Sequence, residues 1–160
     1  MKVYHGGTEI VELPQVSKGR EGLDFGKGFY ITDLLKQAEL WADRMARIRL
    51  GEGIVSVYEF DEVIAKDKYS YKKFDAYDFE WLNFIVANRR GDGFVENYDV
   101  VEGGVANDRV IDTVEAYMSN MMTLETALKN LSEHRPNNQL CIRSQKVVDE
   151  CLHFVESYKK

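Results

Sequence analysis

The chain has 160 residues, of which 44% are hydrophobic and 30% are charged, so we expect one globular domain over residues 1–160. Its 21 basic and 27 acidic side chains give a formal net charge of −6, which argues against a large basic surface for duplex nucleic acid. No apolar run could cross a bilayer, and no signal-peptide core is present. With Cys141 and Cys151 expected as free thiols, the sequence predicts a cytoplasmic protein.

The N-terminal half contains short apolar stretches, one segment with apolar residues at helical spacing and a long segment without regular hydrophobic spacing. Apolar and β-branched composition predicts strands at residues 2–5, 25–32 and 53–60. Apolar residues at helical spacing predict a helix that ends near Gly51 and is capped by Thr32 or Asp33. Residues 8–24 predict a long loop, which is uncommon in compact domains unless it binds something.

The C-terminal half mixes helices with short strands. Helical periodicity predicts helices at about residues 79–90, 107–118, 123–134 and 144–155. Short strands are expected at residues 98–103 and 140–142, whereas residues 61–76 give weak signals. Because strands and helices do not alternate strictly, we predict an α+β fold in place of a doubly wound parallel sheet.

Four short motifs carry a resemblance to a known superfamily. In chain order they are His5-Gly6, Gly26-Lys27-Gly28 followed by Tyr30, Trp41 eleven positions after Tyr30, and Asn138-Gln139. The glycine pair alone indicates only a tight turn. The order and spacing of all four resemble the ADP-ribosyltransferase superfamily, in its diphtheria-toxin and poly(ADP-ribose) polymerase branch. The whole chain is also similar to a small bacterial family of uncharacterised domains, often encoded in toxin–antitoxin-like pairs.

The resemblance implies a fold and an activity. The fold would be one α+β domain of split mixed and antiparallel sheets with flanking helices. The activity would be mono-ADP-ribosylation: transfer of ADP-ribose from NAD, as co-substrate, to a macromolecule, with release of nicotinamide and no metal. The acceptor would be a protein more readily than a nucleic acid, given the charge of −6, and a small antitoxin would be a partner.

The resemblance gives catalytic roles to His5, Tyr30 and Gln139. It gives NAD-binding roles to His5, Gly6, Gly28, Tyr30 and Trp41. His5 would bond the adenosine ribose hydroxyl, and the Gly6 backbone would bond the nicotinamide carboxamide. Tyr30 and Trp41 would hold the nicotinamide ring between them, each face contributing on the order of 1 kcal/mol beyond burial. Alternatively, His5 makes its hydrogen bonds within the fold and has only a structural role, and both aromatic rings belong to the core.

Gln139 stands where the superfamily has its catalytic glutamate. A glutamine keeps a hydrogen bond to a ribose hydroxyl but lacks the charge that stabilises a developing cation. We therefore expect mono-ADP-ribosylation, slow NAD hydrolysis or no turnover. Two alternatives stay open: a non-catalytic module that binds NAD, ADP-ribose or a protein, and a Gln139 that only pairs with a neighbouring strand. Glu102 is a carboxylate that could supply the charge from elsewhere.

Cations just before Tyr30 are candidates for the NAD pyrophosphate. Arg20 and Lys27 are the expected ligands, because Arg20 can bind phosphate bidentately and Lys27 lies in the glycine motif with Gly28. The alternative is a loop whose charges are merely solvated. The chain shows no metal-binding motif, and Cys141, on a short apolar strand, is expected to face the core.

Overall fold

A computed structural model describes residues 1–91 and 96–160 of the chain, with the side chain of residue 108 also left aside. In chain order the elements are β1 (Lys2–Gly7), the short 3-10 turn η1 (Val16–Lys18), β2 (Phe29–Ile31), α1 (Leu35–Arg49), β3 (Ile54–Phe60), α2 (Glu62–Lys68), β4 (Tyr71–Lys73), α3 (Phe79–Arg90), β5 (Val100–Gly104), α4 (Asp108–Met118), α5 (Leu124–Ser132), β6 (Asn138–Ile142), α6 (Gln145–Cys151) and β7 (Leu152–Lys159). The α+β fold is therefore as predicted.

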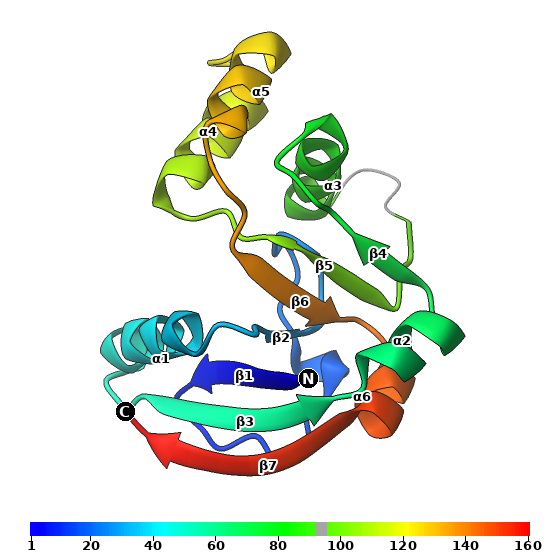
Figure 1. Cartoon of the computed structure of the whole chain (residues 1–160). Coiled ribbons are helices and arrows are strands. Elements are labelled where there is room, and N and C mark those ends of the chain that lie inside the picture. Colours follow the sequence, from blue (N-terminus) through cyan, green and yellow to red (C-terminus); the bar gives the residue numbers. More distant parts are fainter. Residues whose placement is uncertain (92–95) are drawn as a thin grey trace.

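The strands form two sheets, shown one above the other in Figure 1. The first sheet has the strand order β1-β3-β7 and is antiparallel throughout. The second has the order β2-β6-β5-β4 and is mixed, because β4 runs parallel to β5 while the other pairs are antiparallel. A single bridge between Tyr4 and Thr32 joins β1 to β2. The two sheets therefore meet at the strands that carry His5 and Tyr30.

Two apolar cores lie on opposite faces of the second sheet. Alternation along β2, β5 and β6 sends every second side chain to each face. The face toward the first sheet carries Phe29, Ile31, Val100, Leu140 and Ile142. The other face carries Val101 and Cys141 and packs, with Tyr30, against side chains of α3, α4 and α5, the helices above this sheet in Figure 1. Burial raises the pKa of the Cys141 thiol to about 12, so this predicted core residue stays protonated.

Most predicted helices are present, and three of them begin as the sequence indicates. In each, the side chain before the helix accepts a hydrogen bond from the backbone N–H three residues later; these caps are Asp78, Asn107 and Thr123. Helix α3 ends at Gly91, whose φ of 67° is the left-handed conformation that glycine adopts at no steric cost.

Three predictions about element boundaries were wrong. Helix α1 starts after Leu34 with no side-chain cap. The Thr32 hydroxyl lies too far before the helix to cap it: it accepts from the backbone N–H of Leu34 at 3.1 Å and donates to the carbonyl oxygen of Asn138 at 3.0 Å. The strand predicted at 25–32 is only Phe29–Ile31, since Gly26 has a φ of 80° that no extended strand tolerates. The terminal helix stops at Cys151, and Leu152–Lys159 pairs with β3, a tertiary contact that overrides the local helical period.

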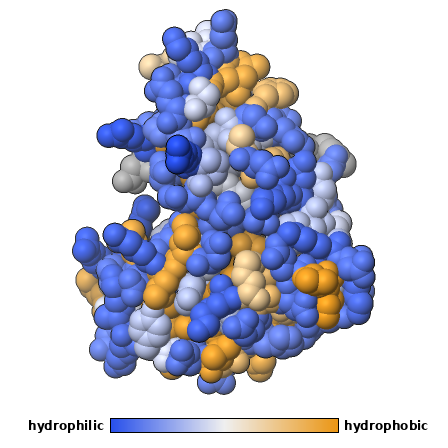
Figure 2. Space-filling model, viewed as in Figure 1, coloured by the Kyte–Doolittle hydropathy of each residue, from blue (hydrophilic) through white to orange (hydrophobic). Residues whose placement is uncertain are grey.

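The weak segment at 61–76 contains α2 and β4. The face of the molecule shown in Figure 2 is mostly polar, and its apolar side chains form separate small groups. Within the part of the chain that the structure describes, no helix is long and apolar enough to cross a membrane.

Candidate functional site

His5 lies against β2, where the two sheets meet. Its Nδ1 donates a hydrogen bond to the carbonyl oxygen of Tyr30 at 2.8 Å, and its ring stacks on Phe29 with 4.5 Å between centroids. Burial lowers the pKa of His5 and outweighs the opposing effect of the bond to Tyr30. The ring is therefore neutral at pH 7, with its proton on Nδ1 and Nε2 left as an acceptor. Gly7, the residue beside Nε2, has no side chain to cover it.

The Tyr30 side chain is fixed by the turn that precedes its strand. Its hydroxyl donates to the carbonyl oxygen of Gly26 at 2.6 Å and accepts from the backbone N–H of Phe25 at 3.1 Å. Burial raises the pKa of Tyr30, so the hydroxyl remains a donor over the whole physiological range. These two bonds hold the half-buried ring in one orientation against the core beneath α3.

Gln139 lies on the same face of the second sheet as Tyr30. Tyr30 is directly opposite Cys141 on β6, two residues from Gln139, so Tyr30 and Gln139 are diagonal cross-strand neighbours. Gln139 is 3% exposed. Among buried side-chain nitrogen and oxygen atoms of the described residues, only its Nε2 lacks a hydrogen-bond partner. An unpaired buried donor costs about 1–3 kcal/mol, so this atom is exceptional among the buried polar atoms of the described residues.

Trp41 lies on the side of α1 that faces the start of β6. Gln37, one turn earlier on the same helix face, donates from Nε2 to the carbonyl oxygen of Asn138 at 3.3 Å. The Trp41 ring is half-buried. Its role in holding a nicotinamide ring with Tyr30 stays a prediction.

Gly6 allows α1 to lie directly on β1. A Cβ atom at Gly6 would be 2.0 Å from the carbonyl oxygen of Ala38, so any side chain would displace the helix. This packing role is not visible in the motif itself. The contact fixes the distance between the strand that bears His5 and the helix that bears Trp41.

The Gly26-Lys27-Gly28 motif closes a compact loop. A Cβ at Gly19 would be 2.6 Å from the Gly28 carbonyl oxygen, and one at Gly28 would be 2.5 Å from the Cys141 sulfur. Turn geometry and close packing therefore require glycine at these positions whether or not a ligand binds there. Gly19 and Gly28 are in contact at the base of this loop. Arg20 follows Gly19 and Lys27 precedes Gly28, so both cations lie beside this contact. Lys27 is 3.8 Å from the Glu21 carboxylate, Arg20 is exposed, and their phosphate role stays a prediction.

Glu102 lies on the opposite face from Gln139. It is opposite Leu140 in the register, so its side chain points toward the first sheet while Gln139 points away from it. The Glu102 carboxylate accepts from the Tyr71 hydroxyl at 2.6 Å and from Asn138 Nδ2 at 3.3 Å, and it lies 3.3 Å from Lys73 Nζ. It therefore cannot supply a negative charge on the Gln139 face. No sequence motif indicates this cluster, since its members come from three different strands.

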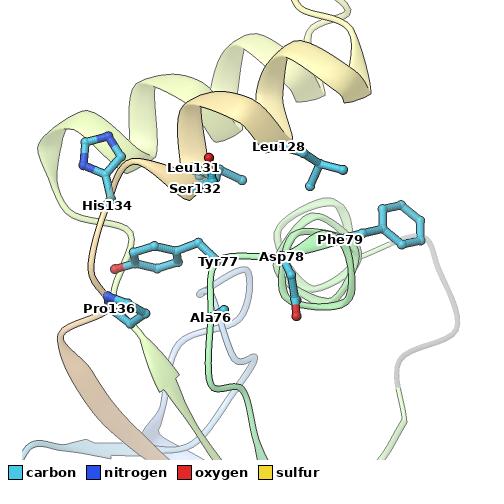
Figure 3. A pocket seen from close by; sticks show the side chains of 9 residues that line it. All are labelled: Ala76, Tyr77, Asp78, Phe79, Leu128, Leu131, Ser132, His134 and Pro136. Carbon is cyan, nitrogen blue, oxygen red and sulfur yellow. The ribbon is translucent and has the colours of Figure 1, made fainter.

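The clearest cavities lie away from these residues. One, of about 360 Å³, lies between α3 and the end of α5 and is lined by Tyr77, Phe79, Leu128 and His134 among others (Figure 3). Its Tyr77 hydroxyl already donates to the Val105 carbonyl oxygen. A more open one, of about 410 Å³, lies beside Gly22 and Arg89. Neither contains an unpaired buried polar atom among the described residues, so we place the candidate site where the strands of His5, Tyr30 and Gln139 adjoin. The His5 ring lies there against Phe29 on the face toward the first sheet, whereas Tyr30 and Gln139 point to the other face.

Comparison with known families assigns the chain to one of them. The family described as "Protein of unknown function (DUF3990)" matches residues 1–154, which is nearly the whole chain. The chain belongs to this DUF3990 family. Searches of curated proteins and of solved structures found no match.

Proposed function

We propose that this DUF3990 protein is a mono-ADP-ribosyltransferase that transfers ADP-ribose from NAD to a macromolecular acceptor and releases nicotinamide. The observation that carries the proposal is the unpaired Gln139 Nε2, buried on the same face as Tyr30. A ligand oxygen that accepts from this atom would remove the cost of leaving it unpaired. The order and spacing of the four sequence motifs support NAD as that ligand.

Each residue of the site has a chemical role in the proposal. The neutral His5 offers Nε2 as an acceptor for a ribose hydroxyl. Tyr30 and Trp41 hold the nicotinamide ring, and Gln139 donates to the ribose beside the bond that breaks. Arg20 and Lys27 lie at the base of the same loop, where they would bind the pyrophosphate.

The missing carboxylate favours a slow enzyme. Cleavage of the nicotinamide–ribose bond develops positive charge on the ribose, which a neutral amide stabilises less than a carboxylate does. Single transfer to an acceptor is expected in preference to chain elongation. The toxin of a toxin–antitoxin pair would suit such an activity, with the cytoplasm as its compartment and a small antitoxin as its partner.

A second function is a non-catalytic NAD- or ADP-ribose-binding module, or a protein-interaction module on the same fold. Glu102 favours this alternative, because the carboxylate nearest to Gln139 along the paired strands points to the other face. The same face would then bind a nucleotide and perform no chemistry.

Incubation with NAD carrying a labelled adenosine, together with cell lysate, decides between them. We expect label on a protein acceptor and stoichiometric release of nicotinamide, and we expect neither from the Trp41→Ala variant. Leu40→Ala is the matched control, since Leu40 is the neighbouring exposed residue on α1. NAD binding without nicotinamide release would support the NAD-binding module. Absence of NAD binding would overturn both the transferase and the NAD-binding module, and would leave a module that binds ADP-ribose or a protein. Label lost on nuclease digestion would identify a nucleic acid acceptor.

A further inference from the structure

The Glu102 carboxylate is buried on the face opposite the candidate site. It is 6% exposed, and its partners are Tyr71, Lys73 and Asn138. Lys66 of α2 also lies over the Tyr71 ring, 5.2 Å from its centroid. The carboxylate therefore has a cation, a phenol and an amide as partners, which offset the cost of burying its charge.

Asn138 connects this carboxylate to the candidate site. Its side chain donates to Glu102, while its carbonyl oxygen accepts from the Thr32 hydroxyl at 3.0 Å and from Gln37 Nε2 at 3.3 Å. One residue thus joins β5, the end of β2 and the first turn of α1. The next residue along the strand is Gln139, and the next turn of α1 carries Trp41.

We infer that Glu102 is a positioning residue, which fixes the start of β6 through Asn138 and thereby places Gln139 relative to Tyr30 and Trp41. The ionised carboxylate accepts only, so it forces the Asn138 side chain to present its NH₂ group. A neutral amide at position 102 could turn its own NH₂ group toward Asn138 and lose this restriction. The inference rests on the proposed function only for the identity of the ligand.

Glu150 provides a matched control elsewhere in the fold. Its carboxylate also accepts from a lysine and a tyrosine, Lys68 and Tyr69. It lies on α6 and has no bond to β6 or α1 among the contacts of the described residues. Glu150→Gln therefore removes a carboxylate charge with the same kinds of partner, at a more exposed position, without touching Asn138.

Hydrogen exchange measured by mass spectrometry tests the positioning. In Glu102→Gln we expect amides of residues 32–41 and 138–141 to exchange about tenfold faster than in wild type, the effect of about one lost charged hydrogen bond. Tyr71→Phe, a milder change, should accelerate the same segments less, and Glu150→Gln should leave them unchanged. The double variant Glu102→Gln with Asn138→Asp exchanges donor for acceptor and should restore protection.

Titration of the same variants with NAD in a calorimeter links positioning to the site. We expect NAD affinity to fall about tenfold in Glu102→Gln, to recover in the double variant and to stay unchanged in Glu150→Gln. Unchanged exchange in Glu102→Gln, or an equal effect in Glu150→Gln, overturns the inference. If wild type binds no NAD, the proposed function fails, and the exchange data alone still decide whether Glu102 holds β6 in place.

Discussion

Asn138 and Gln139 are adjacent amides on β6 that point to opposite faces of one sheet, and their surroundings differ completely. Asn138 has the Glu102 carboxylate as its side-chain acceptor, and its carbonyl oxygen has two further donors. Gln139 is more deeply buried, yet its Nε2 has no partner. The fold itself therefore explains the Asn138 amide, whereas it leaves the buried Gln139 amide without a partner among the described residues.

The largest effect on stability and binding is expected from removal of Tyr30, which lies on the same face of the second sheet as Gln139. Tyr30→Ala removes a core-packed ring and the hydroxyl that holds the 25–26 turn, so the free energy of unfolding should fall by about 3 kcal/mol. NAD binding should be lost more completely than in Gln139→Ala, because a ring provides more contact area than one neutral hydrogen bond. Denaturant titration and calorimetry measure both quantities. Tyr30→Phe is the control, which keeps the ring and should retain NAD binding; equal NAD affinity in wild type and Tyr30→Ala would contradict the assignment.

The next largest effect is expected when the hydrogen-bonded amide of Asn138 is replaced by an apolar side chain of similar size. Asn138→Leu removes the donor to Glu102, so we expect the free energy of unfolding to fall by about 2 kcal/mol, as for other hydrogen bonds to charged groups. Chemical denaturation provides the measurement. A variant as stable as wild type would show that the Glu102 contact contributes little to the fold.

The same change one residue later should have the opposite sign. Gln139→Leu replaces an unpaired buried donor by a side chain of similar size, so the free energy of unfolding should rise by about 1 kcal/mol. NAD affinity should fall about tenfold in the same protein, since the ligand loses a hydrogen bond. Destabilisation by Gln139→Leu would mean that the amide has a structural partner, and the contrast between the two faces would be lost.

The smallest effect concerns pH. Burial holds the pKa of folded His5 below its usual 6.5, so the unfolded chain binds the proton more readily. The contribution to stability is complete above pH 6.5 and declines as pH falls toward the folded pKa, with a slope of at most about 1.4 kcal/mol per pH unit. His5→Asn retains a donor near Nδ1 without a titrating group, so its stability should vary less between pH 6.5 and 5. Parallel profiles for the two proteins would contradict this.

Sequence patterns were reliable where the information is local. The cap of α3 at Asp78 and its end at Gly91 follow from single residues and their neighbours. The motifs at His5, Tyr30 and Gln139 also come together as neighbouring strands, although their roles stay predictions. Strand β7 could not be predicted, because its conformation depends on pairing with β3 almost a hundred positions earlier.

The two faces of β6 could not be distinguished from sequence for the same reason. The Glu102–Asn138 contact spans 36 positions and exists only in the observed register of β5 and β6. A shift of one residue would exchange the faces and place Asn138 beside Tyr30. Which of two neighbouring amides has a partner is thus a property of the assembled sheet.

Gly6 has a consequence for how this family diverges. Because α1 occupies the space of its missing side chain, selection for a stable fold retains this glycine whether or not any nucleotide is bound. Relatives that bind no nucleotide should therefore still carry Gly6. At position 139 the amide nitrogen has no partner among the described residues, so this position should vary first in such relatives, and apolar residues are expected there.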